Sequence, residues 1–438
     1  MKTELHNYDI YPKVVKTGEN TKITIRPLGS HACFSQGTYT LRVTPMNETK
    51  RNLPGAKDPE YTIKAENGLL QFAHDFPKEG EYAISFGNVE LRVYALEEDL
   101  FGCRPYMGDL HVHSSYSDGR ESPAVVAANY RKGGFDFFAL TDHGRYEPSL
   151  EAIEEYKNAP IDFCILTGEE VHAPGNSSHY IHFGGSFGVN SIYGADPEKY
   201  RREVLEIEKT LELPEDIKPY ANEYASSLWI YGKIREAGGC SVMVHPHWVH
   251  DHAYHKPADL TIYELQKKPF DAIELIGGMG MSDEGQVYEN QMQVSLWQQA
   301  REDGYFVPPL GSSDSHGTVN REYDYFKLGR TIVLSEKLEK DSIIEAIRAG
   351  RSVALEQYKG EKAPRCYGKH RYNAYAMFLL VEYFPLHDDL CHEEGRLMKE
   401  YTAPGDAAAS ENAKARLAAL KGQTQKLLDK YWGQENNT

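Results

Sequence analysis

Short runs in which apolar and polar residues alternate dominate the first hundred positions of the chain. Examples are KITIRPL (22–28), TYTLRVTP (38–45), EYAISFG (81–87) and VELRVYAL (89–96). Alternation with period two is typical of β-strands with one buried face, and the glycines, prolines and asparagines between the runs favour turns. The pattern predicts an all-β, sandwich-like N-terminal domain over residues 1–100.

From about residue 101 the pattern changes to apolar runs separated by helical stretches. The runs are DFFALTDH (136–143), DFCILTGEE (162–170), CSVMVHPH (240–247), DAIELIGG (271–278) and YFVPPLGSSDSH (305–316). This order predicts an α/β domain with parallel strands over residues 101–350, with a charged helical insertion near 190–220. Two further helical stretches, at 371–384 and 407–432, predict a C-terminal helical extension over residues 351–438.

Composition and charge narrow the class of protein. The chain has 438 residues, 40% of them hydrophobic, and a formal net charge of -17. This charge argues against binding to nucleic-acid polymers or anionic membranes. The six cysteines form no CxxC pair, so no disulfide framework is expected. The sequence has no apolar leader and no stretch long enough to cross a bilayer, and a cytoplasmic location is the expectation.

Potential metal ligands stand at the ends of the apolar runs. In GDLHVHSSYSDG (108–119) two histidines share one side of a strand, and an aspartate follows in a turn. Each later motif contributes a histidine or a carboxylate. The full set is His111, His113, Asp118, His143, Glu170, His182, His245, Asp314 and His316. Because the carboxyl ends of parallel strands meet at one rim, we expect these side chains to converge.

Taken singly, each residue also has a structural interpretation. The first two histidines could be solvated, and His143 or Asp314 could cap a helix. Glu170 beside Glu169 could be a solvated loop pair, and His182 on an alternating strand could be a core histidine. A metal site explains all of them together, whereas the structural interpretations require a coincidence at the end of every strand.

The ligand types indicate which metals the site would take. Six imidazoles and three carboxylates without a thiolate suit two or three ions of zinc, manganese or iron, with Glu170 as the expected bridge. Magnesium alone does not suit so many nitrogen ligands. The ions would outweigh the three carboxylates and attract an anion, and they would produce hydroxide at neutral pH. Hydrolysis of a phosphate ester follows from this chemistry, although not uniquely.

The same motifs resemble those of the PHP (polymerase and histidinol phosphatase) superfamily of metallohydrolases. GDLHVHSSYSDG, ALTDH, GEEV, HYIHFGG, VMVHPH and LGSSDSH occur in the family's order between about residues 106 and 350. The opening motif and the preceding β domain are most similar to the CehA/McbA-like branch. The resemblance implies a distorted (β/α)7 barrel, the PHP fold, with a trinuclear metal site at the carboxyl ends of its strands.

The resemblance also implies a division of the ligands among the ions. One ion would be held by His111, His113 and Asp314, and Glu170 would bridge it to a second ion. The second ion would be completed by His143, or by His182 together with His245. The third would be held by Asp118, His143 and His316.

Three residues are candidates for catalytic roles. Besides acting as a ligand, His143 lies in the TDH motif, and Arg145 just beyond it could grip a phosphate through two hydrogen bonds. His247, in the histidine-rich stretch HPHWVHDHAYH (245–255), could be a general acid or part of a lid. Arg145 could equally form a surface salt bridge, and the stretch could be a polar loop. Asp109, Asp142 and Glu274 could orient ligand histidines.

Three functions remain open at this point. The first is a metal-dependent phosphoesterase that hydrolyses a small phosphorylated metabolite or nucleotide by a metal-bound hydroxide at a di- or trinuclear site. The second is a metallohydrolase of carboxylic or carbamate esters. The third is a non-catalytic, metal-stabilised scaffold or binding protein. The expected partner is a small molecule, and assembly into a homo-oligomer is compatible with the sequence.

Overall fold

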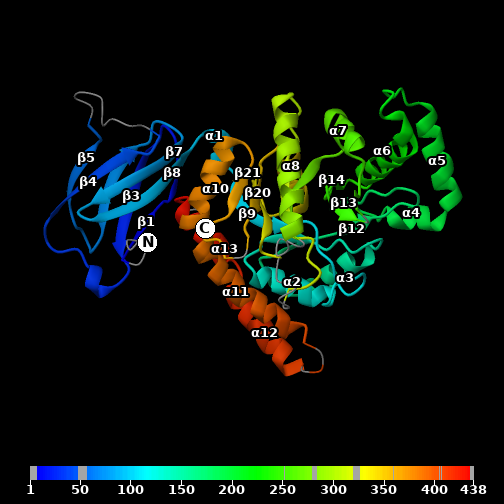
Figure 1. Ribbon diagram of the computed structural model, residues 1–438. Helices are drawn as coiled ribbons and strands as arrows, with labels where there is room; N and C mark the ends of the chain where they lie inside the picture. The colour runs from blue at the N-terminus through cyan, green and yellow to red at the C-terminus, as the bar shows by residue number, and fades with distance from the viewer. Residues whose placement is uncertain are drawn as a thin grey trace. The chain divides into compact units, whose positions relative to one another are not determined.

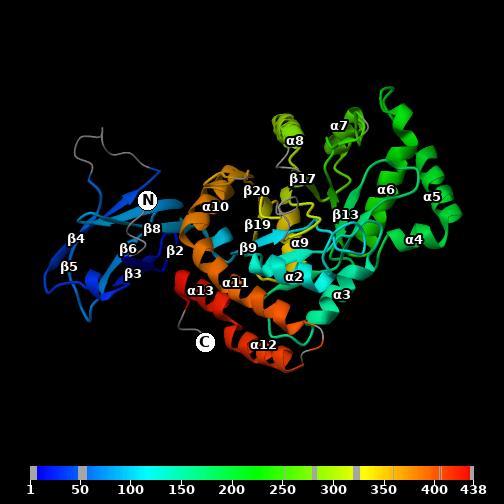
Figure 2. The same cartoon turned by 60° about the horizontal axis from the view of Figure 1, so that its bottom comes forward.

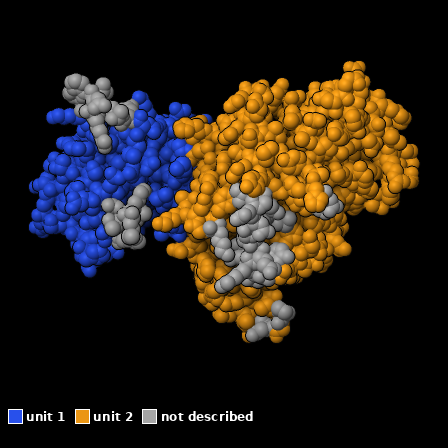
Figure 3. Space-filling view, in the orientation of Figure 1, with its two compact units in different colours: residues 1–104, 374–387, 422–438 blue, residues 105–373, 388–421 orange. Residues whose placement is uncertain are grey.

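The computed structural model describes residues 7–47, 57–250, 252–278, 284–318, 326–358, 360–403, 405 and 407–434. The chain folds into two compact units (Figure 3). Unit 1 comprises residues 1–104, 374–387 and 422–438, and unit 2 comprises residues 105–373 and 388–421. The three-domain division expected from the sequence stays a prediction. The N-terminal β-rich region and the C-terminal helices are both present.

Unit 1 contains two β-sheets. Strands β1 (Tyr8–Tyr11), β3 (Asn20–Pro27) and β6 (Leu70–Asp75) form an antiparallel sheet in the order β1-β3-β6. The second sheet has the order β2-β8-β7-β4-β5, from β2 (Val14–Lys16), β4 (Thr38–Pro45), β5 (Glu60–Lys64), β7 (Gly80–Phe86) and β8 (Val89–Leu96). Ile25 and Phe72 of the first sheet and Leu41 and Val93 of the second belong to one buried apolar cluster. The alternating pattern therefore buries one face of each sheet against a common core.

Unit 1 also contains a short helix after β8, α1 (Glu98–Phe101), and segments close to the C-terminus. One of these segments forms helix α13 (Gln423–Tyr431). The Lys13 ammonium forms an ion pair of 3.0 Å with Glu382, and both side chains are buried. The Lys13 amide also donates to the Tyr431 carbonyl at 2.8 Å. The N-terminal strands are thus tied to residues almost at the other end of the sequence.

Unit 2 is a mixed α/β structure with two main sheets. One has the order β11-β10-β9-β19-β20-β21, from β9 (Arg104–Asp109), β10 (Phe137–Ala139), β11 (Cys164–Leu166), β19 (Gly329–Ser335), β20 (Ser352–Glu356) and β21 (Arg365–Tyr367). The other has the order β12-β13-β14-β17-β18, from β12 (Gly168–Val171), β13 (Tyr180–Phe183), β14 (Cys240–Met243), β17 (Ala272–Gly277) and β18 (Pro309–Ser312). A hairpin of β15 (Val249–His250) and β16 (Ala253–Tyr254) stands apart from them.

The strands of unit 2 are not all parallel, which departs from the sequence-based expectation. β9, β10 and β11 are parallel, as are β14, β17 and β18. However, β13 runs antiparallel to both β12 and β14. The segment from β12 to β13 contains no helix, and a short connection can only return the chain in the opposite direction.

Helices surround these sheets (Figures 1 and 2). They are α2 (Pro123–Lys132), α3 (Glu147–Tyr156), α4 (Asn190–Ala195), α5 (Pro197–Lys209), α6 (Ala221–Glu236), α7 (Ala258–Lys267), α8 (Glu284–Glu302), α9 (Lys340–Arg348), α11 (Phe384–Tyr401) and α12 (Ala407–Leu420), whereas most of α10 (His370–Glu382) belongs to unit 1. Both figures show α4, α5 and α6 side by side, so the stretch predicted as an insertion near 190–220 is largely helical. Among the helices of the described ranges, none is both long and apolar enough to span a bilayer.

Candidate metal centre

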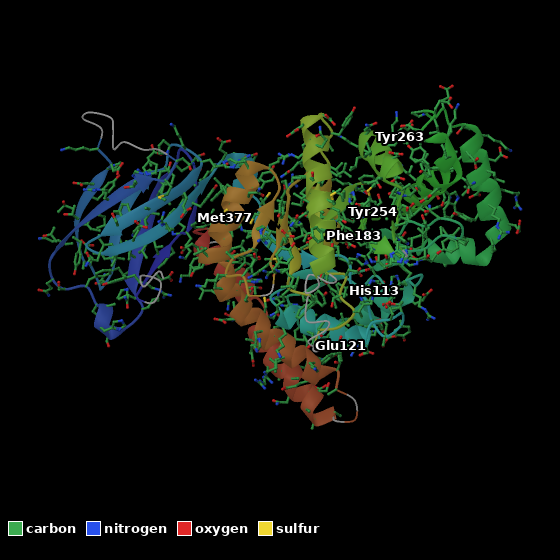
Figure 4. The ribbon with its side chains drawn as sticks, viewed as in Figure 1. His113, Glu121, Phe183, Tyr254, Tyr263 and Met377 are labelled. Carbon is green, nitrogen blue, oxygen red and sulfur yellow. The ribbon has the colours of Figure 1, made fainter. Side chains whose placement is uncertain are left out.

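Most of the predicted ligands follow strands of unit 2, while Glu170 lies within β12 and His182 within β13. His111 and His113 follow β9, and His143 follows β10. Two isolated backbone bridges join the strand ends, one between Val112 and Ser315 and one between His143 and Glu170. Figure 4 labels His113 in this region. The bridges bring the chain after β9 next to the chain after β18, and the chain after β10 next to β12.

The fully buried carboxylate of Glu170 is the centre of the group. Its Oε2 atom lies 2.5 Å from Nδ1 of His143, and 3.5, 3.6 and 3.5 Å from Nε2 of His111, His113 and His172. Its Oε1 atom lies 2.8 Å from Nδ1 of His179 and 3.4 Å from Nε2 of His245. Imidazoles therefore approach both oxygens of one carboxylate, which is the arrangement expected of a bridging ligand.

Two further carboxylates organise the remaining imidazoles. Asp314 Oδ1 lies 2.9 Å from His113 Nε2 and 3.2 Å from His111 Nε2. Asp118 Oδ2 lies 3.2 Å from His316 Nε2 and 3.5 Å from His143 Nε2. The resulting groups of close ligand atoms share members. They are His111, His113 and Asp314; His111, Glu170 and His245; His113, Asp118, His143 and His316; and His179, His245 and His255.

Several buried polar atoms of this centre lack a hydrogen-bond partner within the part of the chain that the structure describes. They are Nε2 of His111, Nδ1 of His113, Oε2 of Glu170, and Nδ1 of both His179 and His245. Nδ1 of His179 lies 2.8 Å from the other oxygen of Glu170, Oε1, yet no hydrogen bond joins the two atoms. Buried polar atoms without partners are costly, and His111 Nε2 and Glu170 Oε2, which face each other at 3.5 Å without a hydrogen bond, fit a shared cation. The donor set thus fits divalent transition metals.

Residues 109–307 of the chain match the family model of the PHP domain. This segment is a PHP domain. It covers the strands and loops that carry seven of the nine predicted ligands, while Asp314 and His316 follow shortly after it. The finer assignment to the CehA/McbA-like branch stays a prediction.

Individual proteins resemble the chain only in part. The DNA polymerase/3'-5' exonuclease PolX of Bacillus subtilis (strain 168) is 31% identical over 104 residues, which is 21% of this chain and 18% of that protein. A two-domain structure from Bacteroides vulgatus ATCC 8482, containing a predicted PHP-like metal-dependent phosphoesterase, has 17% identity and a TM-score of 0.41, and the match covers 58% of this chain and 66% of the other. A structure from Bifidobacterium adolescentis ATCC 15703, assigned as a metal-dependent phosphoesterase, has 17% identity and a TM-score of 0.35 over 56% of this chain and 96% of the other.

The structure of the PHP domain does not bring His182 into the centre with the other predicted ligands. His182 lies on β13 opposite Glu169 of β12, and its Nδ1 donates to Glu169 at 2.9 Å. Side chains alternate between the two faces of a strand, so Glu169 and His182 share the face opposite to that of Glu170. His179, which precedes β13, approaches Glu170 instead. The signal in the sequence was the alternation of side chains along β13: His179 and His182 of the HYIHFGG motif are three positions apart, so their side chains are expected on opposite faces.

The two other histidines that sequence analysis missed lie in loops. His172 follows β12, stacks on His179 at a ring distance of 3.7 Å, and has Nε2 2.9 Å from Nδ1 of His143. His255 follows the β15–β16 hairpin and joins the group of His179 and His245. Each directly follows a strand but lies outside the apolar runs of the sequence, so the pattern of those runs did not single them out.

The residues predicted to orient the ligands behave differently from one another. Glu274 is buried and accepts a hydrogen bond of 2.8 Å from Nδ1 of His111, which fixes the orientation of that ring. Asp142 instead accepts from the Ser114 amide at 2.8 Å and the Ser117 hydroxyl at 2.6 Å. Asp109 accepts from the Ser313 amide. These aspartates hold the loops of the PHP domain rather than a ligand ring.

The two other candidate catalytic residues lie in contrasting surroundings. Arg145 is exposed to solvent beyond the TDH motif. His247 is buried, its ring packs against Tyr254 at 5.1 Å, and burial lowers the pKa of its imidazole. Figure 4 labels Tyr254 on the β15–β16 hairpin. The structure does not place His247 among the ligand groups described above.

The electrostatics of the centre divide its imidazoles into two classes. Burial would lower the pKa of His143, but hydrogen bonds to Asp118 and Glu170 outweigh it and raise the pKa to about 10. Burial would likewise raise the pKa of Asp118, yet its histidine partners hold it below its usual range. In contrast, burial lowers the pKa of His179 to about 4 and that of His255 to about 3. The latter two imidazoles are neutral at physiological pH and are therefore ready to donate a lone pair to a metal.

Proposed function

We propose that the PHP domain is a metal-dependent phosphoesterase that hydrolyses a small phosphorylated metabolite or nucleotide. The observation that carries this proposal is the Glu170 carboxylate, whose two oxygens are approached by six imidazoles with several ring nitrogens unpaired. A single ion cannot use so many converging donors, whereas two or three ions of zinc, manganese or iron can. Divalent ions in such a centre lower the pKa of coordinated water and neutralise charge on a phosphoryl group.

The structure suggests which residues would hold each ion. The first would take His111, His113 and Asp314, and the third would take Asp118, His143 and His316. Glu170 would bridge the first ion to a second, held by His245 and by His179 in place of His182. The isolated bridges between strand ends support closure of the two sheets into the distorted (β/α)7 barrel of the PHP fold, which would hold all three sites at one rim.

The surrounding residues would orient these ligands and the substrate. Glu274 fixes the His111 ring through its 2.8 Å hydrogen bond, leaving the Nε2 lone pair of His111 free for an ion. Arg145, exposed beyond the TDH motif, would form two hydrogen bonds with a phosphate as it entered. His143 would exchange its proton for an ion, because its two neighbouring carboxylates stabilise either positive charge.

One observation favours hydrolysis of a carboxylic or carbamate ester as a second candidate function. A cavity beside the centre is lined by His245, Trp248, Glu274, Gly277, Glu289, Asn290, Gln293 and Asp314. No lysine or arginine occurs in this lining as the structure describes it. Its carboxylates would repel a phosphate monoester dianion on that side, whereas an uncharged ester would meet no such repulsion.

A comparison of three substrates tests these functions. The full chain would be stripped with a chelator, reloaded separately with Mn²⁺, Zn²⁺ or Fe²⁺, and assayed with p-nitrophenyl phosphate, bis-p-nitrophenyl phosphate and a naphthyl carbamate. We expect metal-dependent cleavage of a phosphate ester that is lost in His113→Ala. Cleavage of the carbamate alone would favour the second function. If metal restored the melting temperature but no ester was cleaved, the protein would be a metal-stabilised scaffold.

A further inference from the structure

The β15–β16 hairpin delivers a histidine to the metal centre that the proposed ligand set does not use. The chain leaves the centre at His245, forms the hairpin, and returns at His255. The ring of His255 lies 4.2 Å from that of His179 and 6.1 Å from that of His245, measured between centroids. One ring nitrogen of each of these three histidines lies within 4.8 Å of the others. This separation fits three donors around one ion.

The return of the chain to this position is fixed by buried polar contacts. The His255 amide donates to the Trp248 carbonyl at 2.7 Å, which closes the base of the hairpin. The next residue, Lys256, is buried and forms an ion pair of 3.0 Å with the buried Glu264 of α7. Lys256 also donates to the Ser178 hydroxyl at 3.2 Å, next to His179. One buried ammonium thus holds together the two loops that carry His179 and His255.

A histidine on a solvated loop would need none of these contacts. A buried ion pair gives little net stability compared with apolar residues, so its value here lies in fixing the positions of the loops. The ring of Trp248 packs edge-on against His255 at 4.8 Å and restricts the imidazole further. The Nδ1 atom of His179, which faces Glu170 Oε1 at 2.8 Å, has no hydrogen-bond partner within the described residues, as expected of an atom that donates its lone pair to a metal.

We propose that His255 is a protein ligand of the second ion, completing a site of three imidazoles and one carboxylate with His179, His245 and Glu170. This inference rests on the proposed metal centre and adds a ligand to it. Four protein ligands of this kind form a closed tetrahedral site that suits Zn²⁺, whereas Mn²⁺ prefers more oxygen ligands. An ion held by four protein ligands would act as a fixed charge, and the substrate would bind at the other ions.

The test compares metal binding by three variants of the full chain, without an activity assay. His255→Ala removes the proposed ligand, and His245→Ala removes a ligand of the proposed centre. His252→Asn is the matched control, since His252 is exposed on the same hairpin and asparagine tolerates its positive φ of 67°. Metal content is measured by elemental analysis. Zn²⁺ affinity is measured by competition with a chromogenic chelator, and the visible spectrum of Co²⁺ reports coordination number.

We expect His255→Ala to weaken binding of one Zn²⁺ by about 10–100-fold or more, the range seen when the surroundings of a metal ligand are disrupted. Its Co²⁺ bands should lose intensity as water replaces an imidazole, while His252→Asn matches the unmodified chain. If His245→Ala loses an ion but His255→Ala binds normally, this inference is wrong and the proposed centre stands. If His245→Ala also binds normally, the proposed centre itself is wrong.

A second variant guards against the chance that His255→Ala disturbs the fold. In His255→Cys the proposed position carries a thiolate, which is itself a metal ligand. Co²⁺ bound there should show a new sulfur-to-cobalt charge-transfer band in the near ultraviolet, and the same substitution at position 252 should not. Absence of the band in a folded His255→Cys chain that has taken up Co²⁺ would overturn the inference.

Discussion

Two adjacent glutamates on β12 should respond in opposite ways to the same substitution. Glu170 faces the metal centre, whereas Glu169 faces the other side of the strand and is also fully buried. Glu169 accepts hydrogen bonds from His182 Nδ1 at 2.9 Å, from Asn190 Nδ2 at 2.7 Å and from the Asn190 amide at 3.2 Å, and it also accepts from the Val189 amide. Replacing either glutamate with glutamine keeps its size and removes its charge.

The structure gives the magnitude expected for Glu169→Gln. A hydrogen bond to a charged group contributes about 1.5–3 kcal/mol. Glutamine presents a single acceptor oxygen and turns an NH₂ group toward the other donors, so we expect about half of the four bonds to be lost. The free energy of unfolding should therefore fall by at least about 3 kcal/mol, close to a 100-fold change in the folding equilibrium. The metal ligands are untouched, so most of the metal affinity should remain.

Glu170→Gln should instead act on metal binding. The substitution removes the carboxylate that both His143 and His179 approach most closely. Losing a supporting hydrogen bond to a ligand typically weakens metal affinity about 10–100-fold, and loss of the bridging ligand should cost more than that. The rise in melting temperature that accompanies metal binding should then disappear, because only a ligand bound by the folded state stabilises it.

Thermal unfolding of both variants, with a chelator and with added Zn²⁺ or Mn²⁺, separates the two effects. We expect Glu169→Gln to melt earlier than the unmodified chain under both conditions and to keep its metal-dependent rise. Glu170→Gln should lose that rise and bind fewer ions by elemental analysis. The reverse pattern, in which Glu169→Gln loses the ions and Glu170→Gln keeps them, would refute the assignment of the two faces of β12.

Three further predictions follow from other buried charges. Lys13→Met should lower the free energy of unfolding of unit 1 by about 3 kcal/mol or more, because it removes the ion-pair partner of the buried Glu382 carboxylate. In denaturant unfolding, the double variant Lys13→Met/Glu382→Leu should regain part of that free energy. Burial lowers the pKa of the His74 imidazole below 6.5, so the folded state binds the proton less readily than the unfolded chain. The free energy of unfolding should therefore be highest above pH 6.5 and should fall as the pH drops below that value. Urea unfolding between pH 5 and 8 should show a shallower decline in His74→Phe. Finally, the pKa of His143 is raised to about 10, so its imidazole is protonated at neutral pH in the metal-free chain and metal uptake should release protons. Calorimetry in buffers of different ionisation enthalpy would detect this release, and equal heats of metal binding in all buffers would contradict the prediction.

The sequence predicted most of the centre because its ligands are tied to strand ends. Polar residues that end buried strands meet at one edge of the sheet irrespective of the loops, and the four groups of ligand atoms described above include every predicted ligand except His182. That exception follows from the pleat of one short strand. The two histidines of the HYIHFGG motif lie on opposite faces of the chain. A strand of four residues shows too few alternations to predict which of them faces Glu170.

The C-terminal helices illustrate a different limit. Their helical spacing was evident in the sequence, and α10 and α11 do form over His370–Glu382 and Phe384–Tyr401. However, residues 374–387 belong to unit 1, whereas 388–421 belong to unit 2. Helical periodicity identifies an apolar face but not the partner that buries it. The Lys13–Glu382 ion pair joins residues 369 positions apart, a contact that no local pattern could indicate.

His255 shows why a ligand from a loop escapes the reasoning that finds ligands on strands. The histidine-rich stretch after β14 was conspicuous, but its spacing could not tell which histidine returns to the centre. That choice is made by Lys256, whose buried contacts with Glu264 and Ser178 fix the loop at its exit. Since Glu264 and Ser178 lie on separate elements, the position of His255 depends on the packing of α7 beside the start of β13. The position of a ligand in a loop is therefore fixed by the residues that bury the side chain next to it. In this chain the buried charge of Lys256 indicates the position of His255 better than the spacing of the histidines does.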